Sequence, residues 1–128
     1  MDKEQYIKTT QYVTQYYSDK EMTVLHREGG PAVEYANGDK FWWVNGKLHR
    51  EDGPAGEWYG GGKFWYINGK LHREDGPAVE YATGEKSWHI NGERHREDGP
   101  AMEWVCNGEG WYFINGERVN EDGTPHSA

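Results

Sequence analysis

The chain has 128 residues, which suits a single domain, and only 34% of them are apolar, below the roughly 45–50% of a typical soluble globule. Its formal net charge of −8 argues against sequence-independent binding to nucleic acid or to an anionic membrane, and favours a basic or neutral protein partner. No apolar run is long enough for a membrane span, no signal peptide is recognisable, and the single cysteine, Cys106, cannot form an internal disulfide. These features predict a soluble cytoplasmic protein.

Residues 1–24 carry the stretch "TTQYVTQYYSDKEMTV", whose Thr, Tyr and Val content is typical of β-strands. We expect a capping hairpin that turns at Ser18-Asp19 and covers the first edge of the structure that follows. A short helix from Asp2 to about Thr9 is the alternative.

Residues 25–117 consist of four similar units. The phrase "LHREDGPA" stands at residues 48–55 and again at 71–78, with close variants at 25–32 and 94–101. Its histidines, His26, His49, His72 and His95, are 23 residues apart, and the units are residues 25–47, 48–70, 71–93 and 94–117. Residues 118–128 are a partial, polar fifth copy and a tail, as expected of a terminal cap. Such regular spacing predicts a stack of about four and a half structural repeats.

Each unit alternates turn residues with short aromatic or β-branched runs. The runs read "AVEYA", "FWWV", "FWYI", "SWHI" and "WYFI", a composition typical of strands. Asn-Gly favours the type I′ turn of a tight hairpin. We expect turns in mid-unit at Asn37-Gly38, Thr83-Gly84 and Asn107-Gly108, and at the unit ends at Asn45-Gly46, Asn68-Gly69, Asn91-Gly92 and Asn115-Gly116. The pattern therefore predicts an all-β fold, an elongated single-sheet repeat solenoid of stacked antiparallel hairpins.

Period-two alternation sorts the side chains of each unit's second strand into two faces. One face is expected to form the core, and it holds Trp42, Trp65, Trp88 and Tyr112 with Val44, Ile67, Ile90 and Ile114. The other is expected to be partly exposed, because one unit has Ser87 and His89 there, and its remaining members are Phe41, Trp43, Phe64, Tyr66, Trp111 and Phe113. In the first strand, four glutamates share the side opposite the apolar residues: Glu34, Glu57, Glu80 and Glu103.

The stretch "GPAVEYANGDKFWWVNGKLHREDGPA" at residues 30–55 resembles the MORN (membrane occupation and recognition nexus) repeat in its aromatic strand, its "NGK" turn and its 23-residue period. The resemblance covers about residues 25–123 and is closest to the bacterial variant repeats of antitoxin-like proteins. It implies an elongated, twisted sheet that binds partners along its length and has no active site. Here "HREDGPA" replaces the family's usual "H-G-x-G", and together with the acidic charge this leads us to expect no membrane partner.

The repeated histidines and arginines are expected to form structural ladders. If each unit adds two strands, equivalent residues lie ~10 Å apart, too far for the ~2.0–2.2 Å bonds around one zinc ion. We therefore expect no metal and no cofactor; each histidine either bonds the loop backbone or makes a pH-sensitive contact. The arginines Arg27, Arg50, Arg73 and Arg96 either pair with neighbouring acids or stay free for a carboxylate or phosphate. Because every candidate catalytic residue has copies, we expect no enzyme.

A non-catalytic protein-binding role by surface occupation, as in an antitoxin or inhibitor, fits these features best. The aromatic stripe expected to hold the partner is Phe41, Trp43, Phe64, Tyr66, His89, Trp111 and Phe113, unless residues 1–24 or a second copy of the chain cover it. The acidic face expected to speed encounter with a basic target is Glu34, Glu57, Glu80 and Glu103.

Three other interpretations remain open. The narrowest is a DNA mimic that serves phages or bacteria as a counter-defence inhibitor. The second is a binder of a sugar or nucleotide, held by Trp, Tyr and Arg between units. The third is a scaffold that forms homo-oligomers through its edge strands.

Overall fold

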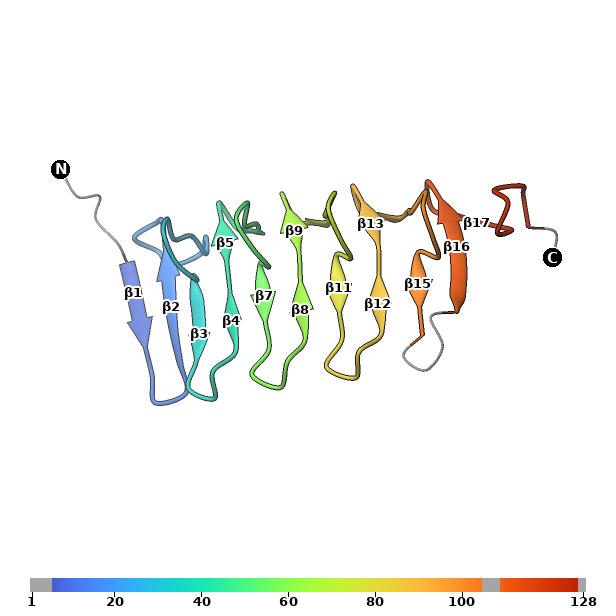
Figure 1. The fold of residues 1–128 in the computed structure, drawn as a ribbon. Helices are drawn as coiled ribbons and strands as arrows, with labels where there is room; N and C mark the ends of the chain where they lie inside the picture. Colours follow the sequence, from blue (N-terminus) through green and yellow to red (C-terminus); the bar gives the residue numbers. More distant parts are fainter. Residues whose placement is uncertain (1–5, 105–108, 127–128) are drawn as a thin grey trace.

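The computed structural model describes residues 6–104 and 109–126, and within them every regular element is a β-strand. Eleven strands form one open sheet in the order β1-β2-β3-β4-β7-β8-β11-β12-β15-β16-β17, and all neighbours are antiparallel. Figure 1 shows the sheet as a row, with β1 and β17 at opposite ends. No helix able to span a bilayer occurs in the described part of the chain.

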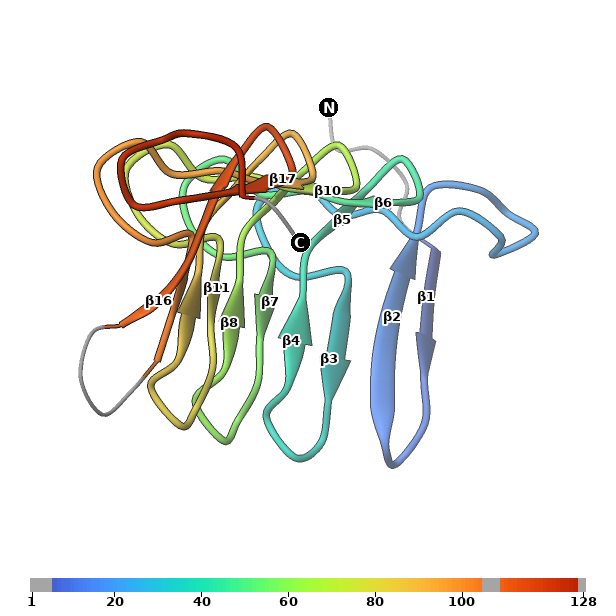
Figure 2. The ribbon, with the colours of Figure 1, turned by 90° about the vertical axis from the view of Figure 1, so that its right-hand side faces the viewer.

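The strands are short, and the chain leaves the sheet once in each unit. The sheet consists of β1 (Tyr6–Thr9), β2 (Val13–Tyr17), β3 (Val33–Tyr35), β4 (Lys40–Phe41), β7 (Gly56–Glu57), β8 (Lys63–Phe64), β11 (Val79–Glu80), β12 (Lys86–Ser87), β15 (Met102–Glu103), β16 (Gly110–Ile114) and β17 (Glu117–Val119). Three separate pairs are β5 (Trp43–Val44) with β6 (Lys47–Leu48), β9 (Tyr66–Ile67) with β10 (Lys70–Leu71), and β13 (His89–Ile90) with β14 (Glu93–Arg94). In Figure 2 the long hairpins extend to one side of a layer formed by these pairs and their loops.

The turn at the end of each unit has the predicted type I′ geometry. In all four, the Asn has a φ between 49° and 51°, and the following Gly has a φ between 78° and 87°. Only Gly and Asn adopt this left-handed conformation at little cost, which explains why the Asn-Gly pair recurs. These four turns therefore match the prediction.

The mid-unit turns differ from the prediction. Gly38 and Gly84 have positive φ values, but Asn37 and Thr83 do not. The Gly38 N–H donates to the Tyr35 carbonyl over 3.0 Å, and the Tyr35 N–H donates to the Asp39 carbonyl over 2.9 Å. This is a three-residue loop closed by a bulge at glycine, so the type I′ prediction was wrong at Asn37-Gly38 and Thr83-Gly84. Asn107-Gly108 and Cys106 lie outside the described residues.

Residues 6–17 form the expected capping hairpin, but it turns earlier than predicted. β1 pairs with β2, and the turn lies at residues 10–12, where the Thr10 hydroxyl accepts the backbone N–H groups of Tyr12 and Val13. The helix alternative was wrong for residues 6–9, which form β1. Asp19 does not lie in the hairpin turn. Instead its carboxylate accepts hydrogen bonds from the Thr23 hydroxyl and from the backbone of residues 23 and 24, and these bonds lower its pKa.

The two faces of the sheet carry different rows of side chains. Strand register places one row across one face: Val33, Phe41, Gly56, Phe64, Val79, Ser87, Met102 and Trp111. Neighbours in this row complement each other in size, since a Cβ atom added at Gly56 would lie 3.3 Å from the Phe41 ring. On the opposite face, glutamates and lysines alternate from strand to strand. A second row on that face, beside the first, consists of alternating Trp and Ala side chains.

The core lies elsewhere than predicted. The four alanines of the repeated phrase are completely buried (Ala32, Ala55, Ala78 and Ala101), and so, at 9% exposure or less, are Val33, Val79, Ser87, His89 and Phe113. None of the eight residues assigned to the core face is buried to this degree; all are half-buried (Trp42, Trp65, Trp88, Tyr112, Val44, Ile67, Ile90 and Ile114). The reason is that the sheet has no second layer over these tryptophans, which are covered only by single side chains.

The unit-end turns provide a test of the backbone geometry. Replacing Asn68 with Ala should lower the free energy of unfolding by about 1 kcal/mol, because alanine disfavours the φ of 49° at this position. Replacing Asn68 with Gly should change it by only a few tenths of a kcal/mol, because glycine accepts this conformation. Thermal and urea unfolding would measure both. Equal losses in the two variants would contradict the role given to φ.

Candidate functional site

Each repeated arginine lies flat on an aromatic ring of the neighbouring strand. The guanidinium carbon is 3.9 Å from the ring centre for Arg50 on Trp42 and for Arg73 on Trp65, and 3.8 Å for Arg96 on Trp88. These are close cation–π contacts. Arg27 makes the same contact at 3.9 Å with Tyr16 of the capping hairpin. The capping hairpin therefore supplies the ring that a preceding unit supplies elsewhere. The sequence separation differs, because Arg27 follows Tyr16 by 11 positions whereas Arg50 follows Trp42 by 8.

The same guanidinium groups are hydrogen-bonded within the chain. Arg73 Nε donates to Asp75 over 3.2 Å, while its Nη1 donates to the Pro77 carbonyl over 3.0 Å and to Glu80 over 3.3 Å. Arg96 repeats all three bonds, and Arg50 repeats them with a longer contact of 3.6 Å to its glutamate. Of the two roles considered for the arginines, the geometry matches pairing with neighbouring acids.

The glycine of the repeated phrase is explained by this packing. A Cβ atom on Gly76 would lie 2.9 Å from the guanidinium carbon of Arg73, and Gly30, Gly53 and Gly99 show the same close approach, at 2.7–3.0 Å. None of these glycines has a positive φ, so the requirement is space for the arginine and not backbone freedom. Sequence reasoning did not identify this role.

Each repeated histidine connects the two ends of its own unit. The Nδ1 atom of His49 accepts the backbone N–H of Asn68 over 2.9 Å, and the Gly69 N–H of the same turn donates to the Leu48 carbonyl over 2.8 Å. His26, His72 and His95 make the same bond to Asn45, Asn91 and Asn115 at 2.9–3.0 Å. Each type I′ turn is thus attached to the Leu-His pair at the start of its own unit, or to Arg94-His95 in the last unit. This arrangement matches a structural role for the histidines.

The glutamates expected to form an acidic face do not form one. Strand register sets them in alternation with lysines, in the Glu–Lys row Glu34, Lys40, Glu57, Lys63, Glu80, Lys86 and Glu103. Each glutamate also lies within 3.1–3.8 Å of a repeated arginine. Because opposite charges face each other on adjacent strands, the row is compensated, and the expectation of an acidic surface at Glu34, Glu57, Glu80 and Glu103 was wrong.

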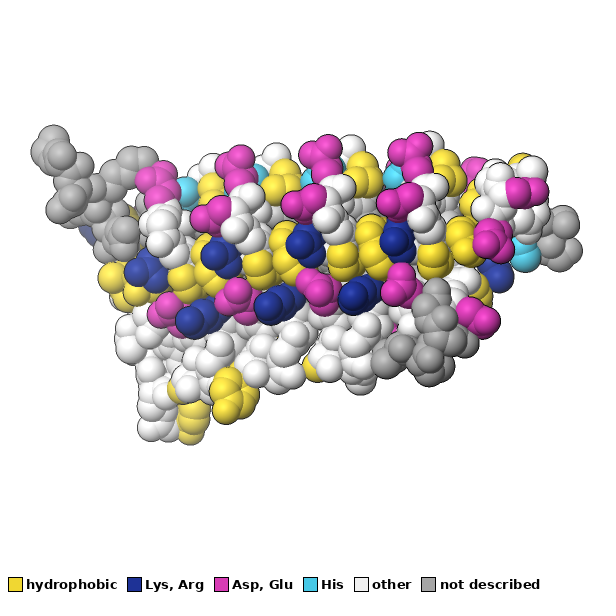
Figure 3. Space-filling model, in the orientation of Figure 1, with side chains coloured by type: hydrophobic (Ala, Val, Ile, Leu, Met, Phe, Trp, Pro, Cys, Tyr) yellow, Lys and Arg dark blue, Asp and Glu magenta, His cyan; other side chains and the backbone are white. Residues whose placement is uncertain are grey.

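A more exposed row of negative charge lies on the loops of the repeated phrase. We call this surface the acidic ridge, and it comprises Glu28, Glu51, Asp52, Glu74, Asp75, Glu97 and Asp98. The side chains of the last six are 84–89% exposed. Figure 3 shows acidic side chains along the loops above the arginine row, while acidic and basic side chains alternate below it.

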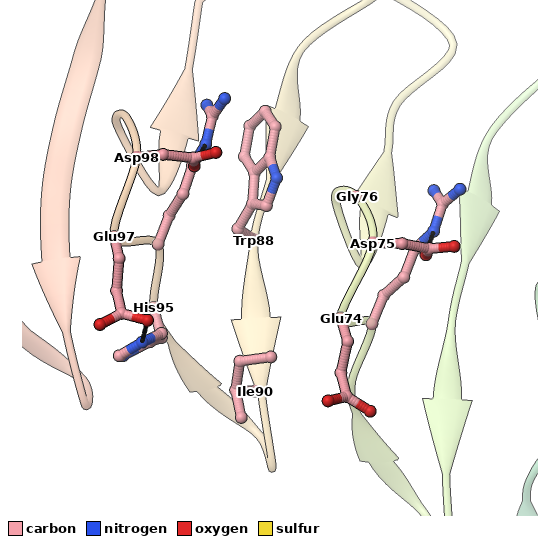
Figure 4. Close-up of a pocket in the computed structure, with 10 residues that line it drawn as sticks. Glu74, Asp75, Gly76, Trp88, Ile90, His95, Glu97 and Asp98 are labelled. Carbon is pink, nitrogen blue, oxygen red and sulfur yellow. Dashed lines mark hydrogen bonds and ion pairs between the residues drawn. The ribbon is translucent and has the colours of Figure 1, made fainter.

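Three clefts lie between neighbouring loops of the acidic ridge. The first, about 470 Å³, is lined by residues of the loops at 27–31 and 49–52; the second, about 580 Å³, by those at 50–53 and 72–75; and the third, about 760 Å³, by those at 73–76 and 95–98. A tryptophan and an aliphatic residue complete each cleft: Trp42 with Val44, Trp65 with Ile67, and Trp88 with Ile90. Figure 4 shows Trp88 between the loop of Glu74 and Asp75 and the loop of Glu97 and Asp98.

The aromatic stripe is only partly available to a partner. His89 and Phe113 are 8% and 9% exposed, so the expected exposure was wrong for them, whereas Trp111 is 43% exposed. Phe41, Trp43, Phe64 and Tyr66 are half-buried. The more exposed rings are on the first strands, where Tyr35, Trp58 and Tyr81 alternate with Phe41 and Phe64 in edge-to-face contacts of 5.0–6.3 Å. Sequence reasoning did not single out these three rings.

Ser87 and His89 form a buried polar pair in the third unit. The Ser87 hydroxyl and His89 Nε2 are 2.8 Å apart, and His89 Nδ1 has no hydrogen-bond partner among the described residues. Burial lowers the pKa of His89, the nearby positive charge of Arg94 adds to this, and the backbone of Gly92 partly opposes it. Because the two side chains are only 4% and 8% exposed, no substrate reaches the hydroxyl. Over residues 6–104 and 109–126, no group of His, Cys, Asp and Glu side chains is arranged to hold a metal ion.

Substitution of Gly76 tests the packing of the arginine. Gly76→Ala should lower the free energy of unfolding by about 1 kcal/mol, because the new methyl group displaces the Arg73 guanidinium from Trp65 and Asp75. Gly60→Ala is the matched control, since nothing lies within 4 Å of its Cβ position. Urea unfolding measures both.

The same substitution in an Arg73→Ala background separates this cause from a general cost of alanine. With no guanidinium to displace, Gly76→Ala should then have almost no effect. An unchanged loss in that background would contradict the packing explanation.

Part of the loss of stability in acid should depend on His89. Its lowered pKa keeps the folded imidazole neutral, while the unfolded histidine, with an ordinary pKa of ~6.5, binds a proton as the pH falls below that value. The contribution of His89 is therefore complete above about pH 6.5 and is lost at lower pH. The melting temperature of His89→Gln should fall less between about pH 8 and pH 5 than that of the unaltered protein. His126→Gln, in the exposed C-terminal segment, should leave the fall unchanged, and an equal fall in all three proteins would refute this assignment.

Comparison with known proteins adds no relative from which a function can be transferred. No family model, no curated protein and no solved structure matches the chain. Its function therefore has to be argued from the surfaces described above.

Proposed function

We propose that the protein is a non-catalytic binding module, a MORN-like repeat solenoid that occupies a basic surface of a partner protein, as an antitoxin or inhibitor does. The observation that carries the proposal is the acidic ridge, in which six of the seven carboxylate side chains are 84–89% exposed. A row of exposed negative charge attracts an oppositely charged partner and speeds encounter with it.

The ridge suits a partner better than the Glu–Lys row does. Glutamates and lysines of that row face each other across the strands, and the arginines beside it are already bonded to Asp, Glu and Pro oxygens. A partner would have to break these contacts before it gained any of its own. The ridge glutamates Glu51, Glu74 and Glu97 are 84–86% exposed and can accept bonds from a partner while the arginine contacts stay intact.

The repeated arrangement argues against catalysis. An active site needs one pre-organised group of residues, whereas the histidines and arginines here make the same structural contacts in each unit. The Ser87–His89 pair is not repeated in the other units, but both side chains are buried, and this separates the pair from any substrate.

The charge density of the ridge favours a basic protein surface over the narrower role of a DNA mimic. Two carboxylates per unit, with units ~10 Å apart, give about one charge per 5 Å. Double-stranded DNA carries one charge per ~1.7 Å of its axis. Four units span ~38 Å, enough to cover one side of a small protein.

The two remaining interpretations have less support. A sugar or nucleotide between units would need free arginines, yet these are bonded within the chain and stacked on the tryptophans. Saturable quenching of Trp fluorescence by millimolar sugar or nucleotide would nevertheless favour it. Self-assembly would use the edge strand β1, and light scattering over a dilution series would reveal it.

Charge reversal on the ridge tests the proposal. Immobilised protein should capture a basic partner from the native host, and capture should weaken as salt is added. The triple variant Glu51→Lys, Glu74→Lys and Glu97→Lys should bind that partner at least about tenfold more weakly. The control variant Glu21→Lys, Glu85→Lys and Glu117→Lys changes the net charge equally at exposed positions away from the ridge, and should bind almost normally. Equal losses in both variants, or no captured protein, would refute the proposal.

A further inference from the structure

We propose that the three clefts of the acidic ridge are sockets for lysine side chains, and that the partner segment is an extended polyproline-type helix with a lysine at every third position. This inference rests on the proposed function and specifies which partner chemistry the ridge takes. It starts from the clefts themselves, which recur between neighbouring loops with the same lining in each unit.

Each cleft combines an apolar side with a charged rim. In the third cleft Trp88 and Ile90 provide the apolar side, and the rim holds Glu74 and Asp75 on one loop and Glu97 and Asp98 on the other. A lysine has the matching division, with a four-carbon stem that packs on apolar surface and an ammonium group that stays at the wet end. A bare metal ion would gain nothing from Trp88 and Ile90.

The charge balance of each cleft also selects a cation. The guanidinium groups of Arg73 and Arg96 line the third cleft, but Asp75, Glu80 and the Pro77 carbonyl already bind the first of them. Arg96 is bound in the same way by Asp98, Glu103 and the Pro100 carbonyl. The lining thus sets two arginines against four carboxylates, those of Glu74, Asp75, Glu97 and Asp98. The rim carboxylates therefore leave the cleft negative, and an anionic group is disfavoured there.

The spacing of the clefts selects the conformation of the partner. Successive clefts are one unit apart, which is two strands at ~4.8 Å each, or ~9.6 Å. In a polyproline helix, residues three apart lie on one face and ~9.3 Å apart, close to this distance. Residues on one face of an α-helix at seven-residue spacing lie ~10.5 Å apart, and residues on one face of a β-strand lie ~6.7 Å apart. The residue spacing of the polyproline helix therefore matches the spacing of the three clefts most closely, and the residue spacing of the β-strand does not match it.

The three sockets are not equal. In the first loop Gly29 takes the place of the aspartate found at Asp52, Asp75 and Asp98, so the first cleft has one carboxylate fewer. It is also the smallest, at about 470 Å³ against about 760 Å³ for the third. We therefore expect the second and third sockets to bind lysine more tightly than the first.

Two peptides of identical composition and charge test the inference. One, with capped ends, has three Lys-Pro-Pro units, and the other has three adjacent lysines followed by the same prolines. Titration calorimetry with the whole protein should give an affinity at least about tenfold higher for the spaced peptide, because only it places a lysine in each socket. Equal affinities would overturn the inference but leave the proposed function standing, since charge alone would then attract both. Absence of binding to either peptide would overturn the inference, and the capture experiment would still decide the proposed function.

Variants at the rim identify the sockets. Glu51→Gln, Glu74→Gln and Glu97→Gln together should weaken binding of the spaced peptide about tenfold, since each exposed charge pair contributes modestly and three are lost. These side chains are 84–86% exposed, so the fold should tolerate the change. The matched control Glu21→Gln, Glu85→Gln and Glu117→Gln should alter binding by less than about twofold. An equal loss in the control, or tighter binding of a helical peptide with lysines seven apart, would refute the socket geometry.

Discussion

The structure depends on one contact, the stacking of an arginine from one unit on the aromatic ring of the adjacent strand. A sheet this thin has no second layer to cover its tryptophans, and the flat guanidinium group takes that role while remaining in contact with water. Most of the repeated phrase follows from this contact. Asp75 and the Pro77 carbonyl fix the guanidinium, Gly76 leaves room for it, and Ala78 fits in the row between Trp65 and Trp88.

The fold class could be predicted from the sequence because the evidence for it is local and repeated. The unit-end turns were predicted correctly, since Asn-Gly specifies its own backbone conformation. The core was not, because alternation along a strand shows that two faces differ but not which is covered. A tryptophan covered by one arginine and a histidine buried beside Ser87 both depend on contacts between residues far apart in the chain.

The candidate site was likewise predicted only in part. The first-strand glutamates and the aromatic stripe were expected to bind a partner, and the arginines to form a structural ladder. Glu80 was expected to belong to an acidic face, but strand register places it between Lys63 and Lys86. Register across strands cannot be read from one unit alone. The more exposed carboxylates belong to a loop, at Glu74 and Asp75, to which sequence reasoning gave no binding role.

The joint between units has a consequence for how such a chain can change in length. Each joint is made between adjacent units: Arg50 of the second unit lies over Trp42 of the first, and the Trp42 N–H donates to the Ala55 carbonyl of the second. Duplication of one 23-residue segment of the gene would therefore create a new joint identical to the old ones and disturb no existing contact. By this route natural selection can match the number of repeats to the length of the target without redesigning any residue.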